Sequence, residues 1–165
     1  MPFFEKVHVT TPSDSSVKVE RSFKAPRDLV YKAYTTPELV QRWSLGYPGW
    51  TMPVCEMDVR VGGKYRQRWR TDDGKQEFGF YGEYKEVDAP NKLVHSEFFD
   101  PGTMGGDMGN GSLITVDFIE ERGFTTIVTF MDFGTKEARD AAVSTGMTDG
   151  MESSYQMLDN LLAKG

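Results

Sequence analysis

The chain has 165 residues, with 25 acidic and 19 basic side chains and a formal net charge of −6. This length suits a single domain with one hydrophobic core. The acidic balance argues against a general nucleic-acid binder or a protein that binds anionic membranes. Cys55 is the sole cysteine, which excludes an internal disulfide framework and a cysteine-based metal cluster.

No targeting or membrane signal is present in the sequence. The first thirty residues hold no apolar signal region. No run approaches the ~18 apolar residues that a membrane span needs. We therefore expect a cytoplasmic protein with no membrane partner.

The N-terminal part predicts one strand followed by two short helices. Residues 1–16 read as an irregular lead-in to a single domain over 17–164, and VKVERSF at 17–23 alternates as a strand does. Its Arg21 shares a face with apolar residues, and it could answer a ligand carboxylate or pair with an acid at the sheet edge. Pro26 and Pro37 stand where helices begin, which predicts helices over 26–35 and 37–43.

From 53 to 133 the pattern has a period of two residues, interrupted by turn signals such as VGG, DDG, DAPN and ERG. Turns at such short intervals favour sequential antiparallel hairpins, because parallel crossovers need a dozen or more residues. Six strands here and the one at 17–23 make about seven. The sequence therefore predicts an antiparallel sheet.

After Thr135 the pattern predicts one long helix, with Val143, Met147, Met151, Leu158 and Leu162 spaced for one face. Two glycines, at 146 and 150, lie one turn apart in it, and each costs roughly 0.5 to 1 kcal/mol relative to alanine. Either the backbone approaches a neighbour closely there or the helix flexes. The order of elements becomes β-α-α-β6-α.

A family resemblance adds to these observations. RSFKAPRDLVYKAYTTPELVQRW, DVRVGGKYR, GEYKEVDAPNKLV, the G-F-T-T strand entry and the terminal GM…GM…L helix resemble the activator of heat-shock-protein-90 ATPase homologue family. That family belongs to the START-like helix-grip superfamily. The resemblance spans roughly 17–163 and implies an α+β fold. In it a curved seven-stranded antiparallel sheet wraps around a long C-terminal helix, with an internal cavity between them.

The strand and helix phases select candidate residues for lining such a cavity. The aromatic phases of 64–71 and 77–88 should face inward, together with Gln67, a polar group suited to orienting a ligand or to a structural hydrogen bond. The resemblance places Val116, Phe118, Val128 and Phe130 inward, and the segment between Trp43 and Trp50 could form the cavity mouth. The ligand-binding candidates are Trp43, Trp50, Tyr65, Gln67, Trp69, Phe78, Phe80, His95, Phe118, Phe130, Met147, Met151 and Tyr155.

The catalytic inventory is small. His95 and Glu97 lie two apart on one strand and hence on one face, which makes a conceivable base and its orienting partner. They point inward only if Val94, Ser96 and Phe98 point outward; Asp132 depends on register in the same way. We expect no metal and no cofactor, and the sequence names no catalytic residue.

Two surface features have structural explanations. The basic row Lys64, Arg66, Arg68 and Arg70 is better explained by cross-strand ion pairs with Glu77 and Glu83 than by nucleic-acid binding. The glycine-rich 101–112 stretch lacks the context of a phosphate-binding loop. It is predicted to be a mobile connection whose Met104 and Met108 could cover the cavity as a lid.

Three functions remain open. The leading one is binding of an apolar or aromatic small molecule in the cavity, because methionine and aromatic side chains suit irregular apolar ligands. An enzyme with acid/base chemistry on such a ligand, of a cyclase or hydrolase kind, is the alternative. The resemblance alone suggests a chaperone ATPase regulator with a stress-response role, although this chain lacks the family's second domain. A homodimer is possible.

Overall fold

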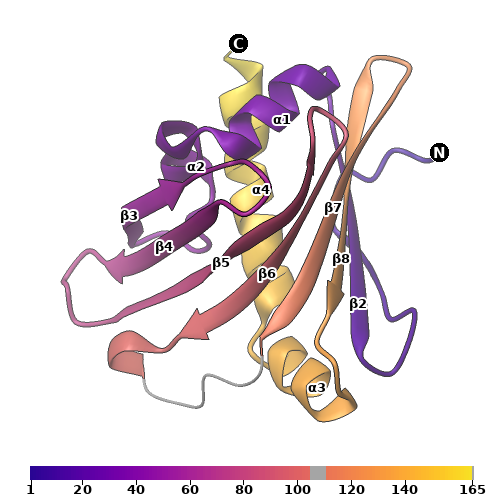
Figure 1. The fold of residues 1–165 in the computed structure, drawn as a ribbon. Helices are drawn as coiled ribbons and strands as arrows, with labels where there is room; N and C mark the ends of the chain where they lie inside the picture. Colours follow the sequence, from indigo (N-terminus) through magenta and orange to yellow (C-terminus); the bar gives the residue numbers. More distant parts are fainter. Residues whose placement is uncertain (105–110, 165) are drawn as a thin grey trace.

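The computed structural model describes residues 1–104 and 111–164, which form one antiparallel sheet of eight strands and four α-helices (Figure 1). The sheet order is β1-β2-β8-β7-β6-β5-β4-β3. The strands are β1 His8–Thr10, β2 Ser16–Phe23, β3 Trp50–Met57, β4 Lys64–Thr71, β5 Glu77–Asp88, β6 Lys92–Asp100, β7 Ser112–Glu121 and β8 Phe124–Asp132. The helices are α1 Arg27–Thr35, α2 Pro37–Trp43, α3 Lys136–Ser144 and α4 Met147–Ala163, with a 3₁₀ turn, η1, at Gly102–Met104.

The predicted antiparallel α+β architecture is confirmed, but the strand count of seven is wrong. The additional strand, β1, lies inside the 1–16 segment that was expected to be irregular. Val9 of β1 pairs with Val19 of β2, so this segment extends the sheet at one edge. Three residues are too few for a period-two pattern to stand out in the sequence.

The helices all lie on one side of the sheet. Figure 1 shows α4 crossing behind the strands, with α1 and α2 at one end of it and α3 at the other. The core forms between this side of the sheet and α1, α2 and α4. Its largest fully buried side chains are Phe23, Phe118, Ile127 and Leu158.

The C-terminal helix is interrupted, contrary to the single helix expected over 136–164. Helix α3 ends at Ser144 and α4 begins at Met147; between them Gly146 adopts φ 81°, a left-handed conformation that glycine tolerates best. Gly150 lies inside α4, and a Cβ there would come no closer than 3.8 Å, to the Tyr47 ring. The backbone therefore requires the first glycine, whereas space does not require the second.

The face predicted for this helix is confirmed within α4. Leu158 is fully buried, and Met147, Met151 and Leu162 pack against the core. Val143 belongs to α3 instead and is 41% exposed. The interruption at Gly146 ends the helical phase that would have carried Val143 onto the same face.

Arg21 fastens α4 to the sheet. The guanidinium is 2% exposed and donates to both oxygens of Glu152 at 3.2 Å and to both oxygens of Asp159 at 2.8 and 3.1 Å. It also donates to the Ser22 carbonyl at 3.0 Å, and the Phe23 ring lies 5.0 Å below it. The expected pairing with an acid is confirmed, but the acids come from α4 and not from the sheet edge.

The same network holds the N-terminal segment. The Val7 amide donates to the Glu152 carboxylate at 2.7 Å, so one carboxylate serves both β2 and the segment before β1. None of the helices in residues 1–104 and 111–164 has the length and apolar character that crossing a membrane would take.

We predict that Arg21→Ala lowers the free energy of unfolding by about 3 to 5 kcal/mol, because it leaves two acids facing each other near a buried site. Arg66→Ala, at an exposed position on β4, is the matched control and should change it by no more than about 0.5 kcal/mol. Urea unfolding of both variants measures the difference. Equal midpoints for the two would show that the network contributes nothing to stability.

Candidate functional site

The inner face of β3 to β6, the face turned toward α4, carries a continuous aromatic surface. Strand pairing places Trp69 beside Phe78, Gln67 beside Phe80, and Phe80 beside Phe99, so all five share this face. The inward phases predicted for β4 and β5 are therefore right. Trp69 stacks on Phe78 with 5.4 Å between ring centroids, and its indole nitrogen donates to the Ser44 carbonyl at 2.6 Å.

These aromatic side chains are half-buried, although they face the helix side of the sheet. Helix α4 packs mainly against α2, and among the strands its main contact is with β2, at the far end of the sheet from β3 to β5. The rings of Trp50 and Phe78 form a T-shaped pair with 5.4 Å between centroids, so the surface extends to β3. The arrangement leaves large apolar side chains half-exposed on the helix side of the sheet.

Tyr65 and Gly82 close one end of this surface. The Tyr65 hydroxyl donates to the Ser96 carbonyl at 2.7 Å. A Cβ at position 82 would lie 2.0 Å from that carbonyl oxygen and 2.9 Å from the Tyr65 ring. Glycine is needed there because any side chain would displace the tyrosine or the neighbouring strand.

His95 and Glu97 both point inward. His95 pairs with Tyr84 and Ile114, which are buried on the inner face, and Glu97 follows two residues later. Their neighbours Ser96 and Phe98 point outward, where Phe98 stacks on the exposed Tyr81. Acid/base chemistry required the side chains of His95 and Glu97 to point inward, and both do.

The His95 ring is held by two polar contacts. Its Nδ1 lies 3.1 Å from the Tyr65 hydroxyl and 3.1 Å from the Ser96 carbonyl oxygen. Since a carbonyl oxygen only accepts, these contacts favour a proton on Nδ1 and leave Nε2 with its lone pair. Burial lowers the pKa of His95 and outweighs the opposing contact with Ser96, which favours the neutral ring.

Glu97 is an ionisable residue of the inner face whose carboxyl is affected mainly by burial. Burial raises the pKa of its carboxyl from the usual value of 4.5 to about 7. No hydrogen bond or ion pair joins this carboxyl to another residue within 1–104 or 111–164. A carboxyl in this state can accept or release a proton near neutral pH.

A second polar group lies deeper, where α1, β8 and α4 meet. The Thr129 hydroxyl is buried beside the Tyr34 and Tyr155 side chains, close enough to oppose the rise that burial causes in their pKa values but outside normal hydrogen-bond geometry with any residue that the structure describes. Burial and the nearby Tyr155 raise the pKa of Tyr34 well above its usual value. Sequence reasoning did not select Tyr34, Thr129 or Phe99, since their phases were unassigned or, for β8, assigned to the wrong face.

The inward orientation predicted for Phe130 is wrong, because this residue lies on the outer face of the sheet. It pairs with Lys18 and Thr115, whereas the residues of β8 that pair with buried Val17, Val19 and Phe118 are Met131, Thr129 and Ile127. Val128 is outward for the same reason. The run IVTFM is apolar or β-branched at nearly every position, so a period-two pattern cannot separate its faces.

Asp132 shares the outward phase of Phe130, and its Oδ1 accepts from the Gly134 amide at 2.9 Å. It is thus removed from the acid/base hypothesis. Trp43, Phe118 and Tyr155 are inward but no more than 4% exposed, and the Trp43 indole donates to the Ala33 carbonyl at 2.9 Å. These three side chains belong to the hydrophobic core and do not line an accessible surface.

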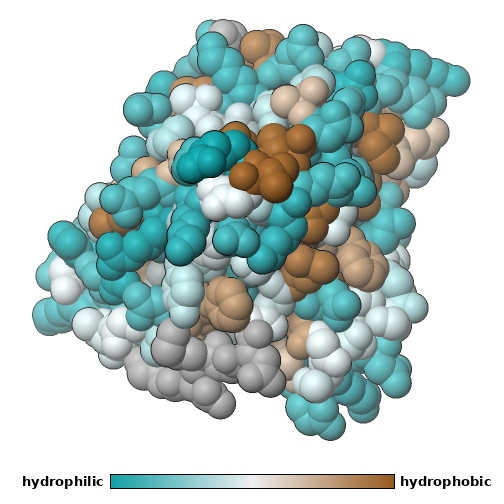
Figure 2. Space-filling view, in the orientation of Figure 1, coloured by the Kyte–Doolittle hydropathy of each residue, from teal (hydrophilic) through white to brown (hydrophobic). Residues whose placement is uncertain are grey.

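Two members of the basic row of β4, Arg68 and Arg70, form ion pairs on the outer face. Arg68 and Arg70 both bond to Glu77 at 2.8 Å, and Arg68 also pairs with Asp100. The cross-strand pairing predicted with Glu77 is confirmed, whereas the one predicted with Glu83 is wrong, because Glu83 pairs with Lys85 of its own strand at 2.8 Å. Figure 2 shows this side of the sheet as mostly hydrophilic, with hydrophobic side chains gathered near its middle.

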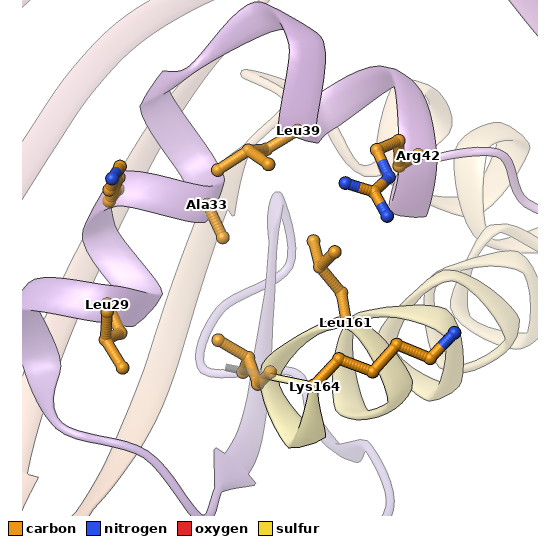
Figure 3. A pocket seen from close by; sticks show the side chains of 8 residues that line it. Leu29, Ala33, Leu39, Arg42, Leu161 and Lys164 are labelled. Carbon is orange, nitrogen blue, oxygen red and sulfur yellow. The ribbon is translucent and has the colours of Figure 1, made fainter.

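An open groove lies apart from the inner face, between α1, α2 and the end of α4 (Figure 3). Its volume is about 330 Å³, and its floor is apolar while its rim is basic. The lining residues are Leu29, Lys32, Ala33, Leu39, Arg42, Leu161, Leu162 and Lys164. In Figure 3 the side chains of Ala33, Leu39 and Leu161 point toward the gap between the helices.

Within the described ranges, no three His, Cys, Asp or Glu side chains gather as a metal site would require. The lid hypothesis for 101–112 concerns Met108 and the Met104 side chain, which both lie outside the described residues.

Glu97 should make stability depend on pH. Its folded pKa is raised, so its contribution is complete below about pH 4.5 and is lost as pH rises toward about 7. Over that window the wild type should lose on the order of 3 kcal/mol of unfolding free energy relative to Glu97→Gln.

Urea unfolding at a series of pH values measures this difference. Glu56→Gln, at an exposed position of β3, should follow the wild type at every pH and serves as the control. Parallel stability curves for the wild type and Glu97→Gln would mean that water or a neighbouring group already satisfies the carboxyl.

Comparisons with known proteins agree with this geometry. A family model described as activator of Hsp90 ATPase homolog 1-like protein matches residues 24–163. A Rhodobacter sphaeroides protein structure is similar at 29% identity, with a TM-score of 0.84 over 96% of this chain and 99% of that one. A Mycobacterium smegmatis protein is similar at 23% identity, with a TM-score of 0.82 over 94% and 96%.

A third solved structure, an AHSA1-like protein from Aeromonas hydrophila, is 22% identical with a TM-score of 0.69 over 87% of this chain and 93% of that one. The search of curated proteins returns no match. The family model covers most of the chain and begins at residue 24, just after β2, so it includes β3 to β6 and α4. The chain belongs to the activator of Hsp90 ATPase homolog 1-like family.

Proposed function

We propose that the inner face of β3 to β6 binds an apolar or aromatic small molecule in a cavity between the sheet and α4. The observation that carries this proposal is the half-exposed aromatic surface of Trp50, Trp69, Phe78, Phe80 and Phe99 on the concave side of the sheet. Accessible aromatic side chains on a concave surface are the usual lining of a ligand site.

The polar groups near this surface suit ligand orientation. Gln67 lies between Cys55 and Phe80 on the same face, and His95 presents its Nε2 from the next part of the sheet. A few polar groups within an apolar lining give specificity, because each fixes the direction of a ligand group. Met147 and Met151 of α4 add flexible side chains that adapt to an irregular ligand.

Binding of the neutral fluorophore N-phenylnaphthylamine tests the site. We expect fluorescence to rise on addition of the wild type, and Met151→Trp to weaken binding at least about tenfold because it fills the space beside the sheet. Asn160→Trp, exposed on the same helix, should bind as the wild type does. Native mass spectrometry of the gently purified protein then identifies any molecule already held.

A third variant separates the two possible sites. Leu161→Trp fills the groove of Figure 3 and should leave fluorophore binding unchanged. If this variant abolished binding while Met151→Trp did not, the ligand would bind between the helices and the proposal would fail. Phe80→Leu, which removes aromatic surface without adding bulk, guards against a folding defect in Met151→Trp.

Acid/base catalysis on the bound molecule is the second candidate, and the inward orientation of His95 and Glu97 favours it. A neutral imidazole with a free Nε2 can take a proton, and a carboxyl with a pKa of about 7 can give one.

If the site is catalytic, His95→Asn and Glu97→Gln should each reduce turnover of the retained molecule by about a hundredfold or more, with its retention preserved. Liquid chromatography of the molecule before and after incubation measures turnover. Unchanged turnover in both variants, or none in the wild type, would leave binding as the function.

The remaining expectations are not supported by a particular contact. A chaperone-regulating role rests on the family description, and the homodimer and the cytoplasmic location rest on the sequence.

A further inference from the structure

Among residues 1–104 and 111–164, the surroundings of Glu97 contain aromatic rings but no compensating positive charge. Along β6 it stands between His95 and Phe99, and across on β5 it faces the stretch between Phe80 and Tyr84, where Gly82 contributes no side chain. Tyr65 lies close enough that the Glu97 charge, after burial, helps to raise its pKa. The Glu97 carboxyl thus lies among aromatic rings.

Among the described residues, no basic side chain of the inner face is free to pair with Glu97. Arg21 is committed to Glu152 and Asp159. The inward positions of β4, β5 and β6 carry no lysine or arginine, and residues 147–163 of α4 carry none either. Burial favours the neutral form of His95. No described residue can therefore neutralise Glu97.

A buried carboxylate is normally paired with a positive group or hydrogen-bonded, because leaving water otherwise costs several kcal/mol. The faces of aromatic rings attract cations as well, so a carboxylate and several rings together select a positively charged group over a neutral one. An anionic ligand would meet the Glu97 charge directly.

We infer that the natural ligand carries a protonated amine on an aromatic or apolar body, with the amine paired to Glu97 and the body against Trp69, Phe78, Phe80 and Phe99. This assignment rests on the proposed binding function and adds the chemical class of the ligand. The Glu97 carboxylate accepts hydrogen bonds from the amine, and the rings beside it contact its positive charge and the adjoining carbon atoms.

Three compounds with the same ring system test the charge preference: naphthylmethylamine, naphthylmethanol and naphthoate. Calorimetric titration is carried out at about pH 8, where the amine is protonated and Glu97 is ionised. We expect the wild type to bind the amine at least about tenfold more tightly than the alcohol, and the naphthoate most weakly of the three.

Glu97→Gln should remove the preference, so that amine and alcohol bind within about twofold of each other, while Glu56→Gln should keep it. Glu56→Gln should bind all three compounds as the wild type does, and measurable binding of the alcohol by Glu97→Gln shows that this variant is folded. A preference that survived in Glu97→Gln would mean that another group recognises the amine, and would overturn the assignment.

The outcomes distinguish this inference from the function on which it rests. Equal binding of all three compounds, weakened by Met151→Trp, would overturn the amine assignment and leave the proposed function standing. Binding of none would contradict both. Tightest binding of the naphthoate, abolished by Leu161→Trp, would place the ligand in the groove with the basic rim and also contradict both.

Discussion

The structure depends on the ion pairs between Arg21 and two acids of α4. A guanidinium offers five donors in a rigid fork, and here each carboxylate accepts two hydrogen bonds from it while the Ser22 carbonyl accepts another. Glu152 and Asp159 lie seven residues apart, about two helical turns. The contact therefore fixes both the distance of α4 from β2 and its rotation about its own axis.

This attachment lies at the β2 end of the sheet, away from the aromatic strands β3 to β5. With α4 held against β2 and α2, the inner faces of β4, β5 and β6 are covered by their own aromatic side chains, which stay half-exposed. Tight packing there would have buried Trp69 and Phe80 as fully as Phe118 is buried beneath α1. The asymmetry of the attachment is what leaves this aromatic surface half-exposed.

Polar groups are placed on this surface by strand register. Because Gly82 of β5 has no side chain, the Tyr65 ring of β4 can lie over β5 and reach β6. There the Tyr65 hydroxyl donates to the Ser96 carbonyl and lies within hydrogen-bond distance of the His95 ring. That alignment favours a proton on Nδ1 of His95. It also leaves the Glu97 carboxyl without a hydrogen bond or ion pair among the described residues. A shift of one residue would turn both side chains to the outer face, where Ser96 and Phe98 now lie.

The sequence by itself determined the sheet-and-helix architecture and the inward phases of β4 and β5. In β4 aromatic and charged residues alternate, and in β5 Phe78, Phe80 and Tyr84 share one phase opposite Glu77 and Glu83. Other features needed the tertiary structure. The run from Ile127 to Met131 is apolar or β-branched nearly throughout, so only pairing with β2 and β7 shows that Phe130 points outward. The acids that pair with Arg21 lie more than a hundred residues away, and β1 is too short for its pattern to be seen. The inward orientation of His95 and Glu97 was likewise decided by register, since either face of that strand would satisfy its sequence.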